Sequence, residues 1–152
     1  MSIESDIKQL KPFKSLHQKV SVNIIFTNNW LNANNAEILK PFGLTSQQYN
    51  VLRILRGQHP NPATVNAIIE RMLDKMSNAS RLVDKLLAKN LVVRQESKDD
   101  RRACDVIITE KGLEILKKID DLRDKWEKKT NNLSPEENEK LSSLLDKLRG
   151  SE

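Results

Sequence analysis

The chain has 152 residues, and its 26 Lys and Arg exceed its 21 Asp and Glu, which gives a formal net charge of +5. With 38% hydrophobic and 31% charged residues, it is too apolar for a disordered chain and long enough for one domain with extensions. Only 4 Gly and 5 Pro argue against an all-β fold, which needs many turns. The mild positive charge permits nucleic acid as a partner without requiring it.

Cysteine usage and hydropathy indicate the compartment in which the protein resides. The single cysteine, Cys104, excludes an internal disulfide, which favours a reducing, cytoplasmic environment. The first residues, MSIESDIKQLKPF, are unlike a secretory signal, and no apolar run approaches the roughly 18 residues of a membrane-spanning helix.

His17 and His59 lack the spacing of a metal site, and no phosphate loop or nucleophile motif is present. We therefore expect no metal, no cofactor and no enzymatic activity.

The first segment predicts one long helix, beginning at Ser5 or Phe13 and ending near Leu39. Its apolar residues recur at helical spacing, and an Asn-rich run at residues 28–35 predicts a bend or fraying there. A second helix follows, with Thr45 as N-cap and Gln48 completing a capping box. It is expected to end at Leu55 or Arg56.

The middle of the chain changes its pattern. Two short helices, at about residues 63–71 and 77–89, flank a break at 73–76, which is the size of a helix-turn-helix. Two strands follow at residues 91–95 and 104–108, joined by a polar loop. A helix-turn-helix followed by a β-hairpin is the layout of a winged helix.

Two more helices complete the chain. Thr109 caps a helix over about residues 110–131, and Ser134 with Glu137 forms the capping box of the last helix. The sequence thus predicts a mainly α fold with a small β-hairpin wing. Its three parts are a long N-terminal helix (1–43), a winged helix-turn-helix domain (44–109) and two C-terminal helices (110–152).

Four motifs in this order resemble the multiple-antibiotic-resistance regulator (MarR) family of bacterial transcription factors: LTSQQYNVLRIL, SNASRLVDKLLAKNLVVR, DDRRA and ITEKGLEIL. Together they cover about half the chain. The resemblance implies a homodimeric DNA-binding regulator, often a repressor, whose DNA affinity is changed by a ligand or an oxidant. Asn90 stands where many relatives have Gly, and Asn is also suited to a left-handed helix end.

The helix at residues 77–89 is the candidate DNA reader. Its apolar residues fall on one side, and polar and basic residues fall on the other, including Lys89. Asn pairs with adenine and Arg with guanine in the major groove. The expected DNA contacts are Ser77, Asn78, Ser80, Arg81 and Lys85. The alternative is the solvated face of an ordinary amphipathic helix.

The polar loop between the two strands is the candidate wing. Its basic residues, Lys98, Arg101 and Arg102, can enter a minor groove, where negative potential is concentrated. The resemblance implies that Asp100 and Arg102 pair and brace this loop. The alternative is an exposed hairpin tip of mixed charge.

The resemblance implies that the terminal parts, 1–43 and 110–152, are dimerisation helices. Their apolar stripes agree with an intertwined homodimer, and hence with an inverted-repeat operator. The alternative is that they pack inside one subunit. The stripe residues are Phe13, Leu16, Val20, Leu141, Leu144, Leu145 and Leu148.

The resemblance also places an effector between the dimerisation helices and the winged domain. A mixed aromatic and polar wall suits a small aromatic or anionic ligand, although core packing is the favoured reading of these residues. The candidates are Phe26, Asn29, Trp30, Tyr49 and Arg53. Strand alternation predicts that Cys104 is a buried structural thiol, with oxidant sensing as the lesser alternative.

The leading hypothesis is therefore a ligand-responsive, DNA-binding transcriptional regulator. A winged-helix module that binds protein and lacks specific DNA affinity is the alternative, and a small enzyme is a third. The placement of charge favours DNA, because residues 71–90 hold five basic and two acidic side chains, an excess of +3.

Overall fold

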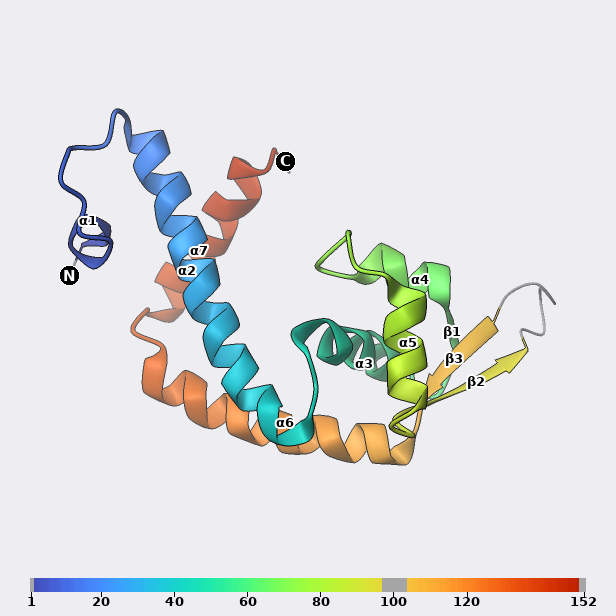
Figure 1. The fold of residues 1–152 in the computed structure, drawn as a ribbon. Coiled ribbons are helices and arrows are strands. Elements are labelled where there is room, and N and C mark those ends of the chain that lie inside the picture. Colours follow the sequence, from blue (N-terminus) through green and yellow to red (C-terminus); the bar gives the residue numbers. More distant parts are fainter. Residues whose placement is uncertain (1, 97–103, 151–152) are drawn as a thin grey trace. The chain divides into compact units, whose positions relative to one another are not determined.

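The computed structural model describes residues 2–96 and 104–150 (Figure 1). The predicted mainly helical fold with a small antiparallel sheet is confirmed. In chain order, the elements are α1 (Ile3–Asp6), α2 (Leu16–Leu39), the 3₁₀ helix η1 (Lys40–Phe42), α3 (Ser46–Gln58), β1 (Ala63–Thr64), α4 (Val65–Arg71), α5 (Ala79–Leu87), β2 (Val92–Glu96), β3 (Cys104–Ile108), α6 (Glu110–Thr130) and α7 (Pro135–Leu148). Residues 1–119 and 120–152 form two compact units, which are described separately below.

The small sheet has the strand order β1-β3-β2, and all its pairings are antiparallel. In the predicted hairpin, Val92 lies opposite Ile108. The strand β1 was missed, because sequence analysis assigned its two residues to the following helix. Thr64 ends β1 and also caps α4, since its Oγ1 accepts the Ala67 N–H at 3.2 Å. A two-residue strand is too short to show the alternation by which strands are recognised.

The core of the first unit lies among α3, α4, α5 and the sheet, and α6 adds Leu116 and Ile119. Tyr49 on α3 and Leu44 just before this helix are buried in this core. The fully buried large side chains are Leu39, Leu52, Leu55, Ile68, Leu86, Leu91, Leu116, Ile119, Val51, Val83, Val92 and Val106. The helix-turn-helix and the hairpin therefore share one hydrophobic core, which fixes α5 relative to the sheet.

The predicted caps are observed. Thr45 and Gln48 form a reciprocal capping box at α3, and Ser134 and Glu137 form one at α7. Asn90 has a φ of +59° just after α5, in the left-handed region expected of it. The expected fraying of the Asn-rich run is wrong, because α2 continues through it without interruption.

The terminal helices expose apolar side chains. In the first unit, Leu16 is 82% exposed, and Val20 on the same helix is also exposed. In the second unit, α7 exposes Leu141, Leu144 and Leu148. Phe13 and Leu145 are half-buried. Within the described residues, no helix combines the length and apolar character needed to cross a membrane.

Candidate nucleic-acid interface

Two side chains, Asn78 and Asp74, fix the start of α5 and the turn before it. Asn78 is the N-cap residue, and its Oδ1 accepts the Arg81 N–H at 3.0 Å, so α5 begins at Ala79, two residues later than predicted. Just before it, Asp74 accepts the Ser77 hydroxyl at 2.8 Å and the Met76 N–H at 3.0 Å. The Ser77 hydroxyl, and next the Met76 N–H, hold the pKa of Asp74 below its ordinary value. The carboxylate therefore anchors the turn that leads into α5.

The two faces of α5 are those that the sequence predicts. Ala79, Val83 and Leu86 are buried in the core, while Arg81 and Lys85 are exposed. Ser80 is exposed as well, and Leu87 is half-buried. One side of α5 packs, and the other presents hydrogen-bond donors and two positive charges to solvent.

Lys89 was predicted to lie on the exposed basic face of this helix, but its side chain is engaged within the protein. Its Nζ donates to the Gly43 carbonyl, and it also lies 3.5 Å from Gln48 Oε1. Lys89 therefore fastens the end of α5 to the turn before α3. The basic row on α5 ends at Lys85.

A hollow of about 290 Å³ lies between the starts of α3 and α5. Four of the predicted DNA contacts line it together, which sequence spacing alone did not predict. Gln47, from the first turn of α3, is an additional lining residue that sequence analysis missed, because no sequence signal places this turn beside α5. The lining residues are Gln47, Ser77, Asn78, Arg81, Leu82 and Lys85. The hollow is thus bordered by amides, a hydroxyl and two cations, all able to donate hydrogen bonds.

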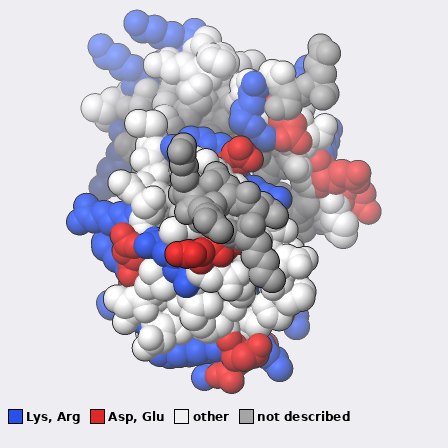
Figure 2. All heavy atoms as spheres, turned by 90° about the vertical axis from the view of Figure 1, so that its right-hand side faces the viewer, with Lys and Arg blue, Asp and Glu red and all other residues white. Residues whose placement is uncertain are grey.

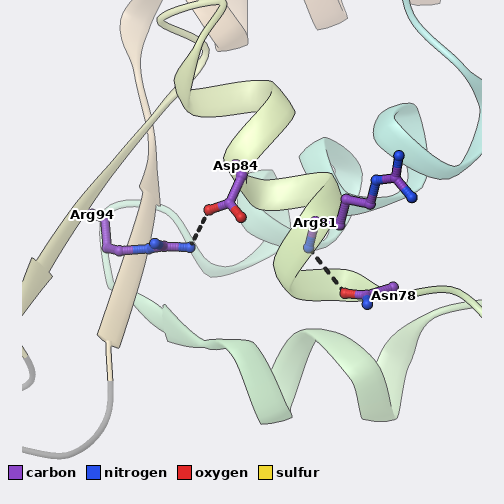
Figure 3. Close-up of polar contacts among 4 residues, drawn as sticks. All are labelled: Asn78, Arg81, Asp84 and Arg94. Carbon is purple, nitrogen blue, oxygen red and sulfur yellow. Dashed lines mark hydrogen bonds and ion pairs between the residues drawn. The ribbon is translucent and has the colours of Figure 1, made fainter.

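An ion pair joins α5 to the wing. Arg94 Nη2 on β2 lies 2.9 Å from Asp84 Oδ1 on α5. Figure 3 shows the Arg81 guanidinium pointing away from this pair. The positive charge of Arg94 therefore offsets the negative charge of Asp84, and the charge of Arg81 stays available to another partner. Sequence analysis missed the pair, since nothing in the sequence indicates which acid Arg94 meets.

The predicted wing residues Lys98, Asp100, Arg101 and Arg102 lie outside the described residues. Their DNA contacts and the bracing pair stay predictions. Figure 2, which views the hairpin side, shows basic and acidic side chains interspersed rather than gathered into one basic patch. Charge alone therefore does not delimit an interface on this face.

The predicted effector residues have different environments. Tyr49 is only 5% exposed and belongs to the core, and the Arg53 guanidinium lies 5.9 Å from the centre of its ring. Phe26, Asn29 and Trp30 are exposed on α2. Tyr49 thus fits the core-packing reading, whereas the three α2 residues are accessible.

The expectation of a buried Cys104 is wrong, because this residue is exposed. It is the first residue of β3 and lies opposite Glu96, beyond the edge of the core, whereas Val106 and Ile108 further along the strand are buried. In the described part of the chain, no three His, Cys, Asp or Glu residues are grouped closely enough to hold a metal ion.

Comparison with known proteins decides the family. The sequence pattern of the MarR family matches residues 42–103. A MarR transcription factor of known crystal structure from Planctomyces limnophilus is 32% identical to this chain, with a TM-score of 0.65. The alignment covers 89% of this chain and 98% of that one. The chain belongs to the MarR family. This is a family of transcriptional regulators rather than enzymes, so the enzyme hypothesis is excluded.

The chain is also similar to more distant proteins. The transcriptional repressor MprA of Escherichia coli K12 is 28% identical over 86 residues, which are 57% of this chain. The match spans about half (49%) of that relative's length. A MepR–DNA complex from S. aureus is 23% identical, with a TM-score of 0.75 and coverage of 86% of this chain and 96% of MepR.

One further similar structure holds a small molecule. The organohalide-sensing regulator RdhR-CbdbA1625, in its 2,4-dichlorophenol-bound form, is 18% identical, with a TM-score of 0.79. The alignment covers 93% of this chain and 86% of that one. At these identities, MepR and RdhR-CbdbA1625 show the shared fold alone.

Proposed function

We propose that this chain is a cytoplasmic, homodimeric repressor that binds an inverted-repeat operator in double-stranded DNA. The observation that supports this most directly is the exposed polar face of α5, with Arg81 and Lys85 beside the hollow at the start of the helix. The opposite face of α5 is buried, so the helix is rigidly mounted and its polar side is free to enter a major groove. The DNA-bound relative MepR adds support from the same fold.

The side chains of α5 divide into two roles. Arg81 donates a pair of hydrogen bonds to guanine, which is worth roughly 1–3 kcal/mol of discrimination against another base. Ser77, Asn78, Ser80 and Lys85 contact neighbouring base edges or phosphates. From the wing, Lys98, Arg101 or Arg102 enters the flanking minor groove, while Asp100 and Arg102 brace the loop.

Dimerisation uses the terminal helices. Leu16 and Val20 on α2, and Leu141, Leu144 and Leu148 on α7, are exposed in this chain and suited to burial against a second copy. A two-fold dimer presents two α5 helices, so the half-sites are expected about one DNA turn, roughly 34–36 Å, apart.

The proposed effector is a small aromatic or anionic compound. The exposed Phe26, Asn29 and Trp30 on α2, with Arg53 on α3, offer apolar and polar contacts of the needed kind. The dichlorophenol-bound relative supports an aromatic ligand. A thermal-shift screen of phenols and aromatic acids tests it, because a ligand that binds the folded state raises the melting temperature.

Selection of bound DNA from a random duplex pool tests the function. We expect enrichment of an inverted repeat, and a steep loss of affinity with salt as phosphate contacts release counterions. Arg81→Ala should weaken binding to the enriched site by about 10-fold or more. The control, Lys117→Ala, removes one exposed positive charge from α6 and should bind nearly as the wild type does. Recovery of no specific sequence at any salt concentration would instead favour the protein-binding module.

A further inference from the structure

The loop between α4 and α5 exposes two large apolar side chains. Leu73 is 86% exposed and Met76 is 93% exposed. Met76 directly precedes Ser77, which lines the hollow together with Asn78, Arg81 and Lys85, so it is next in the chain to the surface that we assign to DNA. Isolated apolar side chains on a surface are common, but two of them in a four-residue stretch beside a binding face are not explained by folding.

This loop is held by hydrogen bonds to α3, to α4 and within itself. The Leu73 N–H donates to Asn50 Oδ1 at 2.9 Å, and Lys75 Nζ donates to the Glu70 carbonyl. Asp74 accepts the Met76 N–H at 3.0 Å. The backbone at Met76 is therefore fixed while its side chain points to solvent.

Met76 does not contribute to the hydrophobic core. Met72, at the start of the same loop, is only 2% exposed and packs against the core cluster. In this loop, Met72 therefore packs in the core, whereas Met76 is exposed to solvent. An exposed Met at this position costs hydration free energy unless a partner covers it.

We propose that Met76 contacts the C5-methyl group of a thymine in the major groove and gives the operator a thymine preference beside the base pair that Arg81 reads. This inference rests on the proposed function. The thymine methyl group is the apolar feature of the major-groove edges, and a flexible thioether adapts to its position. The exposed basic side chains Arg81 and Lys85 on α5 favour DNA as the occupant, since the carboxylate of Asp74, the acid nearest in sequence, is held by Ser77 and the Met76 N–H.

Replacement of thymine by deoxyuridine tests the contact, because it removes only the methyl group. In the selected operator, each thymine of a half-site is replaced in turn, and the affinity of the full-length protein is measured. We expect one position at which deoxyuridine weakens the wild type about fourfold, the effect of one methyl-sized apolar group. At that position Met76→Ala should bind both operators equally, and Met76→Leu should keep the discrimination.

The control is Leu10→Ala, which removes an equally exposed side chain, 98% accessible, from a segment distant in sequence. It should discriminate as the wild type does. If Met76→Ala keeps the full deoxyuridine penalty, or if no thymine position is sensitive in the wild type, the Met76 contact is wrong while the proposed function stands. If the wild type selects no DNA at all, the proposed function fails, and this inference fails with it.

Discussion

Arg94 and Asp84 connect the wing to the candidate reading helix through an Nη2–Oδ1 contact of 2.9 Å. Both side chains are partly exposed, at 34% and 61%, so the pair adds at most about 1 kcal/mol to stability. Its larger effect is on charge. Asp84 is an acid on the helix that we propose to enter DNA, and Arg94 neutralises it.

This relationship predicts a specific pattern of DNA affinities. Arg94→Ala should weaken operator binding by up to about fivefold, because it leaves Asp84 uncompensated near the phosphates. The double variant Asp84→Ala/Arg94→Ala should recover most of that loss. The four proteins form a double-mutant cycle, measured by fluorescence anisotropy at fixed salt. A double variant as weak as Arg94→Ala would mean that Arg94 itself contacts the DNA.

Asn78 is predicted to act first as a helix cap. Asn78→Ala should lower the free energy of unfolding by about 1 kcal/mol, because the Arg81 N–H loses its acceptor. Asn78→Ser keeps a capping oxygen and should cost little stability, but it removes the amide that pairs with adenine. Urea unfolding and operator binding of both variants therefore separate the two roles. Equal stability of Asn78→Ala and the wild type would exclude the cap.

Local signals explain why so much of the fold was predictable. The caps at Thr45 and Ser134 involve residues three apart, and the left-handed Asn90 follows from what a helix end requires. The hairpin strands show runs of β-branched residues bounded by polar loops. In each case the physical cause lies within a few residues of sequence.

The missed features depend on contacts between distant segments. Strand β1 exists because Ala63 and Thr64 pair with Val106 and Asp105 at the free edge of β3, which lies much later in the chain. Gln47 reaches the hollow because α3 and α5 share a core. The exposure of Cys104 follows from where the core ends along β3, which alternation does not indicate. Periodicity predicts which face of an element is buried, but not which other segment covers it.

Gly112 is predicted to be required for the contact of α6 with the hairpin. A Cβ at this position would lie 2.5 Å from the Leu91 carbonyl oxygen and 2.7 Å from Ile108 Cγ1. Both neighbours belong to the buried part of the hairpin, so they have little room to move. Gly112→Ala should therefore destabilise the protein by about 1–3 kcal/mol.

Gly57 is the matched control, since it is also helical and a Cβ there meets nothing within 4 Å. Gly57→Ala should stabilise the protein by about 0.5–1 kcal/mol through helix propensity. In thermal unfolding, the melting temperature should fall for Gly112→Ala and rise for Gly57→Ala. If Gly112→Ala also raised the melting temperature, the close approach at Gly112 would be relieved by movement of α6.

The turn before α5 is predicted to loosen in acid. Hydrogen bonds from the Ser77 hydroxyl and then from the Met76 N–H lower the pKa of Asp74 from its ordinary 3.8. The folded-state pKa is depressed, so the stabilisation is present above pH 3.8 and is lost as the pH falls through the lower folded-state pKa. At neutral pH the turn keeps its geometry, and Met76 is held beside α5. The Met76 amide signal in NMR should titrate with an apparent pKa below 3.8, and Asp74→Asn should abolish that titration. A midpoint at or above 3.8 would show that the carboxylate does not hold these bonds in solution.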